Sequence, residues 1–160
     1  RNVITYNAVI SACEKGHHWK KALGLMREMR RVTCEPDLIT YNATISACEG
    51  AQLWTEALYL LRQMRLSRIN AQAISYNASI SACGKGRQWE EAFVLVQQMR
   101  HTAIESDVFT YNAAVGACEG CLQWTNALRI VLEMRRATVR LDVLTHSIVA
   151  GACAEGGCAV

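Results

Sequence analysis

One segment of the chain, Ile39–Arg65, occurs four times with conservative changes at a constant interval of 35 residues. Its tyrosine, asparagine, tryptophan and methionine each occur at the same position in all four copies. The aligned tryptophans, the only ones in the chain, are Trp19, Trp54, Trp89 and Trp124. Self-similarity at a fixed period of about 20–50 residues is typical of stacked supersecondary units. The sequence therefore predicts an array of one module, in which each unit buries its apolar face on its neighbours instead of sharing a central core.

Each repeat is predicted to be a helix–turn–helix, which makes the chain all-α. Apolar residues recur at intervals of three and four from Trp19 through Met29, the pattern of an amphipathic helix. The β-branched residues that open the first helix of each unit do not outweigh this period. The predicted helices are 4–15 and 19–30, 39–49 and 54–65, 74–85 and 89–100, 109–119 and 124–135, with an unpaired helix at 144–154. The repeats span 3–37, 38–72, 73–107 and 108–142, and a partial unit spans 143–160.

Composition bounds the class of protein. A hydrophobic fraction of 51% excludes a disordered chain, and no apolar run approaches the ~18 residues of a membrane span. The net charge of +3 is too small to indicate a nucleic-acid binder by itself. Because the repeat is already running at Val3, we expect this chain to be a piece of a longer array, with any targeting segment outside it.

Five of the eight cysteines are copies of one repeat position, which argues against disulfides. Equivalent atoms of stacked helices lie about 8–10 Å apart, whereas a disulfide requires Cα atoms within about 7 Å. These cysteines are predicted to be small buried residues: Cys13, Cys48, Cys83, Cys118 and Cys153. Cys118 and Cys121 have metal-site spacing but no second pair, and His17-His18 is interpreted as a solvated turn. No metal site, cofactor or catalytic motif is predicted, so the chain is not expected to be an enzyme.

Two polar positions are not explained by packing. Each complete unit carries an asparagine in the first turn of its first helix, where asparagine is a poor helix former. Three of the four units close on an aspartate just before the next helix, where it could cap that helix. Local capping by the asparagine remains an alternative. If the asparagine does not cap its own helix, it and the closing aspartate would form a series of hydrogen-bonding pairs along one edge of the array.

Several motifs resemble those of the pentatricopeptide repeat family across the whole chain. They are Thr-Tyr-Asn near the start of a unit, Ala-Cys in its middle, Trp-x-x-Ala-Leu, Met-Arg, and Glu-Pro-Asp at its close. The resemblance implies a right-handed α-solenoid whose first helices line the concave face and bind single-stranded RNA, one base per repeat. It implies these base-reading pairs: Asn7 with Asp37, Asn42 with Gln72, Asn77 with Asp107, and Asn112 with Asp142.

In this family an Asn–Asp pair favours uracil, which agrees with the chemistry of the two side chains. An amide donates and accepts, whereas a carboxylate only accepts, so it suits the N3–H of uracil and opposes the N3 lone pair of cytosine. Repeats 1, 3 and 4 are therefore expected to read U. Gln72 departs from the pattern because it can also donate, which leaves the base at repeat 2 open.

The resemblance also implies residues that contact the rest of the nucleotide. Aliphatic or aromatic residues at the second position of each unit would sandwich the bases, although they could instead be first-turn core residues: Ile4, Ile39, Ile74, Phe109 and Leu144. Lys15 and Lys85 match a phosphate-contacting position, which Gly50 and Gly120 occupy in the other units. In the fifth unit, Ser147 replaces the asparagine, so this unit is expected to act as an end piece.

The predicted function is a sequence-selective, uridine-favouring single-stranded RNA-binding module, acting in RNA processing, stability or editing in a mitochondrion or plastid. Two alternatives remain: a protein-interaction scaffold of the tetratricopeptide type, or the targeting part of a larger RNA-processing enzyme. No membrane partner is expected. Uncovered apolar helix faces at the two ends of an array could also lead to self-association or bind protein partners.

Overall fold

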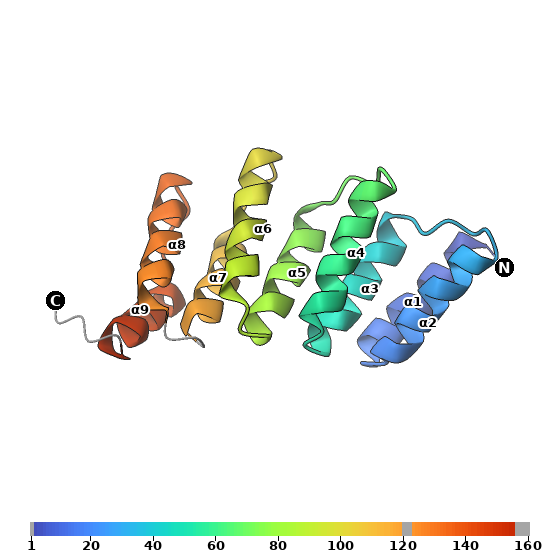
Figure 1. Cartoon of the computed structure of the whole chain (residues 1–160), viewed down its shortest axis with the longest axis horizontal. Coiled ribbons are helices and arrows are strands. Elements are labelled where there is room, and N and C mark those ends of the chain that lie inside the picture. Colours follow the sequence, from blue (N-terminus) through green and yellow to red (C-terminus); the bar gives the residue numbers. More distant parts are fainter. Residues whose placement is uncertain (1, 120–122, 156–160) are drawn as a thin grey trace. The chain divides into compact units, whose positions relative to one another are not determined.

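The structure is a computed structural model (Figure 1) that describes residues 2–119 and 123–155, apart from the side chains at 119, 124, 144, 148, 149, 152, 153 and 155. The described residues form helices joined by short turns. In chain order these are α1 (Val3–Lys15), α2 (Trp19–Arg31), α3 (Leu38–Gly50), α4 (Trp54–Leu66), α5 (Ala73–Lys85), α6 (Trp89–His101), α7 (Val108–Glu119), α8 (Trp124–Arg136) and α9 (Val143–Glu155). The predicted helices are confirmed, with ends that differ by no more than one residue. None of the described helices combines the length and the hydropathy that crossing a membrane requires.

Polar side chains cap the N-termini of α1 and α3. Asp37 accepts a hydrogen bond from the backbone N–H of Thr40 at 2.9 Å, and the Thr40 hydroxyl accepts one from the N–H of Asp37 at 3.2 Å. This reciprocal capping box satisfies two N–H groups that the helix leaves without partners. Asn2 caps α1 through the N–H of Thr5 at 3.0 Å. The cap therefore lies before the helix, and the asparagine of the repeat motif lies inside it.

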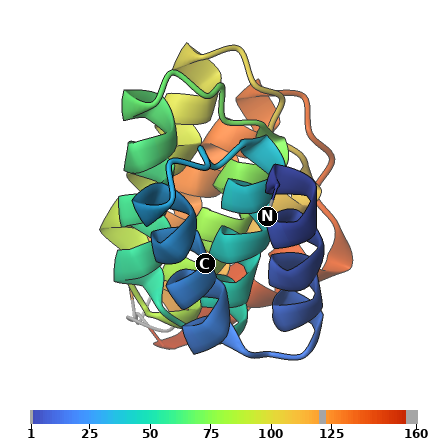
Figure 2. The same ribbon diagram turned by 90° about the vertical axis from the view of Figure 1, so that its right-hand side faces the viewer.

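The chain divides into two compact units, residues 1–82 and 83–160. In the first unit, α1 packs on α2 and α3, and α3 packs on α2 and α4. Figure 1 shows α2 and α4 in front of α1 and α3, so first and second helices form separate layers. Figure 2 looks onto the hairpin of α1 and α2. In the second unit, α7 packs on α6, α8 and α9, and α9 also packs on α8.

The core of the first unit is made of residues that recur with the repeat. Ile10, Ala22 and Met29 are fully buried where α1, α2 and α3 meet. Their counterparts in the later repeats are buried too: Ile45, Ile80, Val115, Ala57, Ala92, Ala127, Met64, Met99 and Met134. Trp19 packs against this cluster and stays partly exposed.

The repeated cysteines are buried free thiols wherever their side chains are described, as predicted for Cys13, Cys48, Cys83 and Cys118. Burial raises the pKa of Cys48 and of Cys83 to about 12, and the nearby charges of Glu56 and Glu91 add to the shift. A thiol with so high a pKa stays protonated at neutral pH and is a poor nucleophile. Cys153 and Cys121 lie outside the described side chains.

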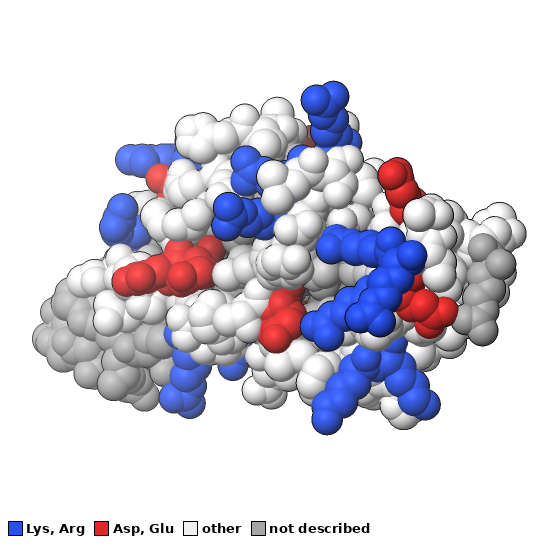
Figure 3. Space-filling model, turned by 45° about the vertical axis from the view of Figure 1, so that its right-hand side comes forward, with Lys and Arg blue, Asp and Glu red and all other residues white. Residues whose placement is uncertain are grey.

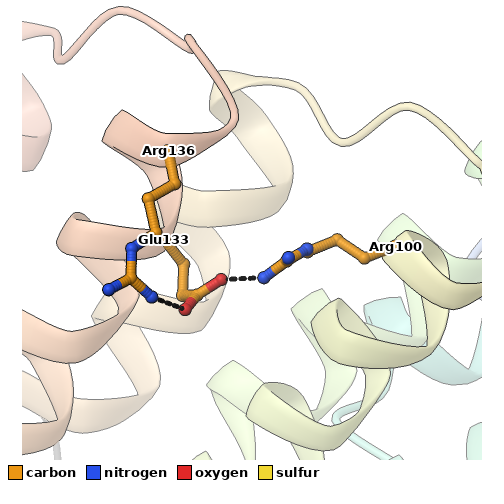
Figure 4. A network of polar contacts seen from close by, with 3 residues as sticks. All are labelled: Arg100, Glu133 and Arg136. Carbon is orange, nitrogen blue, oxygen red and sulfur yellow. Dashed lines mark hydrogen bonds and ion pairs between the residues drawn. The ribbon is translucent and has the colours of Figure 1, made fainter.

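One ion-pair network joins second helices within the second unit. Glu133 of α8 accepts hydrogen bonds from Arg100 of α6 and, at 3.1 Å, from Arg136 one turn along α8 (Figure 4). In the first repeat, Glu28 occupies the position of Glu133 and accepts a hydrogen bond from the hydroxyl of Tyr6 at 2.8 Å. The matching Tyr111 hydroxyl is buried and has no hydrogen-bond partner in the described part of the chain.

The turns between helices contain left-handed residues that are not glycine. In the part of the chain that the structure describes, seven such residues have φ between 54° and 60°: His17, Thr33, Gln52, Arg68, Arg87, Ala103 and Thr138. Gly16 is the C-cap of α1 with φ −85°, and the left-handed residue is the next one, His17. At this turn the N–H of His18 donates to Cys13 O at 2.8 Å, which satisfies a carbonyl of the last helical turn. The hydrogen bonds of the turn therefore hold a backbone conformation that a side chain disfavours.

Ala103 offers the simplest test of this strain, because its methyl group is exposed and φ is 54°. Ala103→Gly is expected to raise the free energy of unfolding by about 1 kcal/mol, since glycine enters the left-handed region without a steric penalty. Ala8→Gly, at an exposed site inside α1, is the control and is expected to lower it by about 0.5–1 kcal/mol. Urea unfolding of both variants checks the opposite signs, and a loss of stability in Ala103→Gly would contradict the assignment.

Candidate nucleic-acid interface

In the first unit, the predicted pair Asn7 and Asp37 is a direct contact. The Asn7 amide nitrogen Nδ2 donates to both carboxylate oxygens of Asp37 at 3.0 Å. The Thr40 hydroxyl donates to the Asn7 oxygen Oδ1 and also lies 2.9 Å from Asp37 Oδ1. Asp37 therefore caps α3 and holds the asparagine of the preceding repeat with the same carboxylate. Local capping by Asn7 of its own helix is wrong, because Asn2 fills that role.

The second unit contains the same arrangement at its own repeat junction. Asn112 Nδ2 donates to Asp142 Oδ2 at 3.0 Å, and the Thr145 hydroxyl donates to Asn112 Oδ1 at 2.5 Å. The Thr145 backbone N–H donates to Asp142 Oδ1 at 2.7 Å. The network of asparagine, aspartate and threonine thus occurs in two separate compact units, so it is a property of the repeat and not of one place in the chain.

The junction after the second repeat keeps part of this network. Ser75 takes the place of Thr40, donates to Asn42 Oδ1 at 2.6 Å, and accepts from the backbone N–H of Gln72 at 3.2 Å. Gln72 supplies no carboxylate, and its side chain is exposed. The hydroxyl contact to the asparagine therefore survives where the acidic partner is absent.

Asn77 and Asp107 belong to different compact units, and their pairing stays a prediction. Asp107 does cap α7, since it accepts from the Thr110 N–H at 2.8 Å. At each closing aspartate the cap therefore forms as expected.

The hydroxyl residue is the member of this network that sequence reasoning missed. At successive repeat junctions it is Thr40, Ser75, Thr110 or Thr145, always three residues after the closing Asp or Gln. The signal was available, because an acidic residue followed at the third position by threonine is a capping pattern. What the spacing did not indicate is that the same hydroxyl reaches back to the asparagine of the preceding repeat.

A row of apolar side chains is exposed one helical turn before the asparagines. Ile4 is 75% exposed, and its counterparts Ile39, Ile74 and Phe109 are 58%, 60% and 57% exposed. The alternative that these are first-turn core residues is therefore wrong for these four. Residues three apart lie on one face of a helix, so Ile4 and Asn7 share a face of α1. Their contact with bases remains a prediction, and the Leu144 side chain lies outside the described residues.

The two lysines predicted to contact phosphate are exposed, but not every repeat has a lysine at this position. Lys15 and Lys85 lie in the last turns of α1 and α5, where a positive charge also interacts favourably with the helix dipole. Gly50 takes this place at the end of α3. Figure 3 shows the side on which the second helices lie in front, where acidic side chains lie among the Lys and Arg side chains. The net charge of the chain is only +3. Attraction for a polyanion should therefore be present but modest.

Hydrogen bonds lower the pKa of the two carboxylic acids in the network, Asp37 and Asp142. Burial raises the pKa of Asp37, but hydrogen bonds from the Thr40 N–H, the Asn7 amide and the Thr40 hydroxyl outweigh it and bring the pKa below the ordinary 3.8. The N–H and hydroxyl of Thr145 likewise lower the pKa of Asp142, and Asn112 contributes. Both groups are therefore carboxylates at neutral pH and can only accept hydrogen bonds. Among the described residues, no three His, Cys, Asp or Glu side chains converge on a possible metal position.

The lowered pKa of Asp37 implies a pH-dependent contribution to stability. A carboxylate whose folded pKa lies below its unfolded value stabilises the fold above that unfolded value, and this contribution is lost as the pH falls through the folded pKa. The free energy of unfolding should therefore decrease on acidification from pH 7 to below 3.8. Asp37→Asn, which keeps a capping side chain, should show a smaller decrease, measured by urea unfolding at each pH.

Glu35→Gln is the matched control, since it removes the same charge from an exposed neighbour of the network. It should leave the acid dependence as in the unsubstituted chain. Equal acid dependence in Asp37→Asn and the unsubstituted chain would contradict the assigned hydrogen bonds.

Solved structures with the same fold cover nearly the whole chain. The crystal structure of the pentatricopeptide repeat protein PPR10 from maize matches with a TM-score of 0.85 and 22% identity over 98% of this chain. PPR10 in complex with an 18-nt psaJ RNA element matches with a TM-score of 0.78 and 26% identity over 94%. This chain spans 22% of the length of PPR10 in both comparisons.

A third structure, the PPR domain of Arabidopsis thaliana protein-only RNase P 1 (PRORP1) in complex with tRNA, has a TM-score of 0.87 and 16% identity. That match covers 97% of this chain and 82% of the domain. Together these matches show that the fold is an α-solenoid of helical repeats. No curated protein sequence matches the chain.

Sequence profiles identify the repeat itself. A profile described as the PPR repeat family matches residues 1–50 and 71–119, and a profile described as the PPR repeat matches residues 39–69. The matched segments contain the asparagines, the closing residues Asp37, Gln72 and Asp107, and the hydroxyl residues of the first three junctions. The chain therefore belongs to the PPR repeat family.

Proposed function

We propose that the chain is a sequence-selective single-stranded RNA-binding module that reads about one base per repeat and prefers uridine at repeats 1, 3 and 4. The observation that carries this proposal is the asparagine–aspartate contact held at 3.0 Å in both compact units. Each contact is anchored by a helix cap and lies one turn from an exposed apolar side chain. A packing role alone gives no reason to hold an amide and a carboxylate together beside such a side chain.

The hydrogen-bond capacity left in the network supports a pyrimidine reader. An asparagine amide has two N–H donors and two acceptor lone pairs. In the network of Asn112, the carboxylate uses one donor and the hydroxyl uses one lone pair. One donor and one acceptor remain for a base edge, and the aspartate can accept from the N3–H of uracil. Cytosine would place a lone pair there.

The asparagine and aspartate are more exposed in the second network than in the first, and this affects how strongly each pair can discriminate bases. Asn7 is only 8% exposed, so a base would reach it mainly through its remaining edge and the half-buried Asp37. Asn112 is half buried and Asp142 is exposed. We therefore expect repeat 4 to discriminate bases more strongly than repeat 1.

The comparisons support RNA as the ligand class. PPR10 is described in complex with an RNA element and the PPR domain of PRORP1 in complex with tRNA. Because PRORP1 is a protein-only RNase P, a second candidate is that this chain is the targeting part of a larger RNA-processing enzyme. The family resemblance makes a mitochondrion or plastid the proposed compartment. A protein-interaction scaffold is the competing function, favoured by the net charge of only +3.

Fluorescence anisotropy with labelled U-rich, C-rich and A-rich oligonucleotides tests the proposed function. We expect U-rich RNA to bind most tightly. Affinity should fall with salt by a shallow slope, because few basic side chains are placed to neutralise phosphates. Equal binding of all three sequences, or none at low salt, would reject base reading and favour the scaffold.

The carboxylates provide a sharper prediction. Asp37→Asn and Asp142→Asn keep a capping residue but add a donor opposite the N3–H of uracil. Each substitution should reduce the preference for U over C at its own nucleotide by about fivefold, the value of one hydrogen bond. Anisotropy with oligonucleotides that vary one nucleotide at a time measures this ratio.

The control is again Glu35→Gln, which makes the same change in net charge. It should raise the affinity for all RNAs alike and leave the ratio of U to C unchanged. A ratio that survives both aspartate substitutions would show that the carboxylates do not select the base.

A further inference from the structure

At three junctions the hydroxyl near the start of the following helix donates to the asparagine of the preceding repeat. We infer that Thr40, Ser75 and Thr145 are positioning residues that determine which edge of Asn7, Asn42 and Asn112 faces a base. This inference rests on the proposed function. It adds to each reading pair a third residue that does not itself contact the RNA and whose identity sets how strictly the pair discriminates.

The orientation of Asn7 depends on the acceptor to which the Thr40 hydroxyl donates its proton. Thr40 accepts the N–H of Asp37 at 3.2 Å, so its own proton is free to be donated. Its two candidate acceptors are Asn7 Oδ1 and Asp37 Oδ1. The contact to Asn7 is the shorter of the two, and it places the amide oxygen against the hydroxyl. The amide nitrogen is then on the side of the Asp37 carboxylate, where it donates twice at 3.0 Å.

A flipped amide would be disfavoured at this junction for two reasons. Its oxygen would face the ionised carboxylate at the distance now occupied by the nitrogen, and two acceptors would repel each other. Its nitrogen would face the hydroxyl and leave the hydroxyl proton with only the carboxylate as acceptor. Thr40 and Asp37 therefore fix the same orientation of Asn7, and the geometry of Asn112 with Asp142 and Thr145 repeats this redundancy.

The second junction lacks the redundancy. No carboxylate is present at Gln72, and the hydroxyl of Ser75 lies 2.6 Å from Asn42 Oδ1. Because Ser75 already accepts from the Gln72 N–H, its proton points away from that group and toward the amide oxygen. Ser75 is thus the group that turns the Asn42 oxygen toward the protein and leaves the N–H edge to meet an acceptor on a base. Repeat 2 should depend on its hydroxyl more than repeats 1 and 4 do.

The three junctions lead to a graded experiment on the whole chain. Anisotropy is measured with oligonucleotides in which each position in turn is A, C, G or U, and the ratio of the tightest to the weakest base is recorded per position. Ser75→Ala should reduce this ratio at one position by about fivefold, the value of one hydrogen bond. Thr40→Val and Thr145→Val should reduce it by about twofold or less, since the carboxylates still orient their asparagines.

Matched variants separate positioning from helix capping. Ser75→Thr restores the hydroxyl and should restore the ratio. Thr5 occupies the same cap position in α1 and bonds only Asn2 at 2.9 Å and 3.0 Å, with no asparagine of a preceding repeat within this chain. Thr5→Val should therefore lower the melting temperature much as Thr40→Val does, yet leave every base ratio unchanged.

The outcomes distinguish this inference from the proposed function. If the unsubstituted chain shows no base preference at any position, the proposed function fails and the inference fails with it. If it shows preferences that Ser75→Ala leaves intact, or if Thr40→Val affects its position as strongly as Ser75→Ala does, RNA reading stands and the positioning role is overturned. Loss of one ratio in Ser75→Ala, recovery in Ser75→Thr and unchanged ratios in Thr5→Val support it.

Discussion

The carboxylate of Asp37 belongs to two structures at once, and the junction between the first two repeats depends on this double use. It caps α3 by accepting the N–H of Thr40, and it accepts the amide of Asn7 from the helix pair before it. Because Asp37 caps α3, its carboxylate is held in a fixed position. Asn7 therefore has a hydrogen-bond partner at a defined place. The same bonds keep the group ionised by lowering its pKa. Helix initiation, contact between successive repeats and the chemistry of the candidate site therefore share one side chain.

The sequence predicted the helices well because the 35-residue period repeats the same evidence. Helix ends agree within one residue, since the apolar pattern of each helix and the turn that follows it recur in every repeat. The backbone conformation of the turns was not predictable in the same way. Left-handed residues such as Gln52 and Ala103 carry no glycine signal, because hydrogen bonds of the turn impose their conformation from outside.

The candidate site was predictable in its residues but not in its connections. Alignment of the repeats identified Asn7 and Asp37 as unexplained polar positions, and the structure joins them directly. The hydroxyl of Thr40 has an ordinary explanation as part of a cap, and nothing in the linear sequence shows that it also reaches a residue 33 positions earlier. Residues with two roles are hard to find by pattern, because the first explanation already accounts for their presence.

Differences among the junctions then acquire a physical meaning. An asparagine held by both a carboxylate and a hydroxyl, as Asn112 is, has one orientation enforced twice. Asn42 is held by Ser75 on one side only, next to an exposed Gln72 that can donate or accept. A pair with fewer constraints can match more than one base, because the cost of turning its amide is smaller. Variation at the closing residue therefore changes two properties together: the groups offered to the base and the rigidity with which the asparagine offers its own.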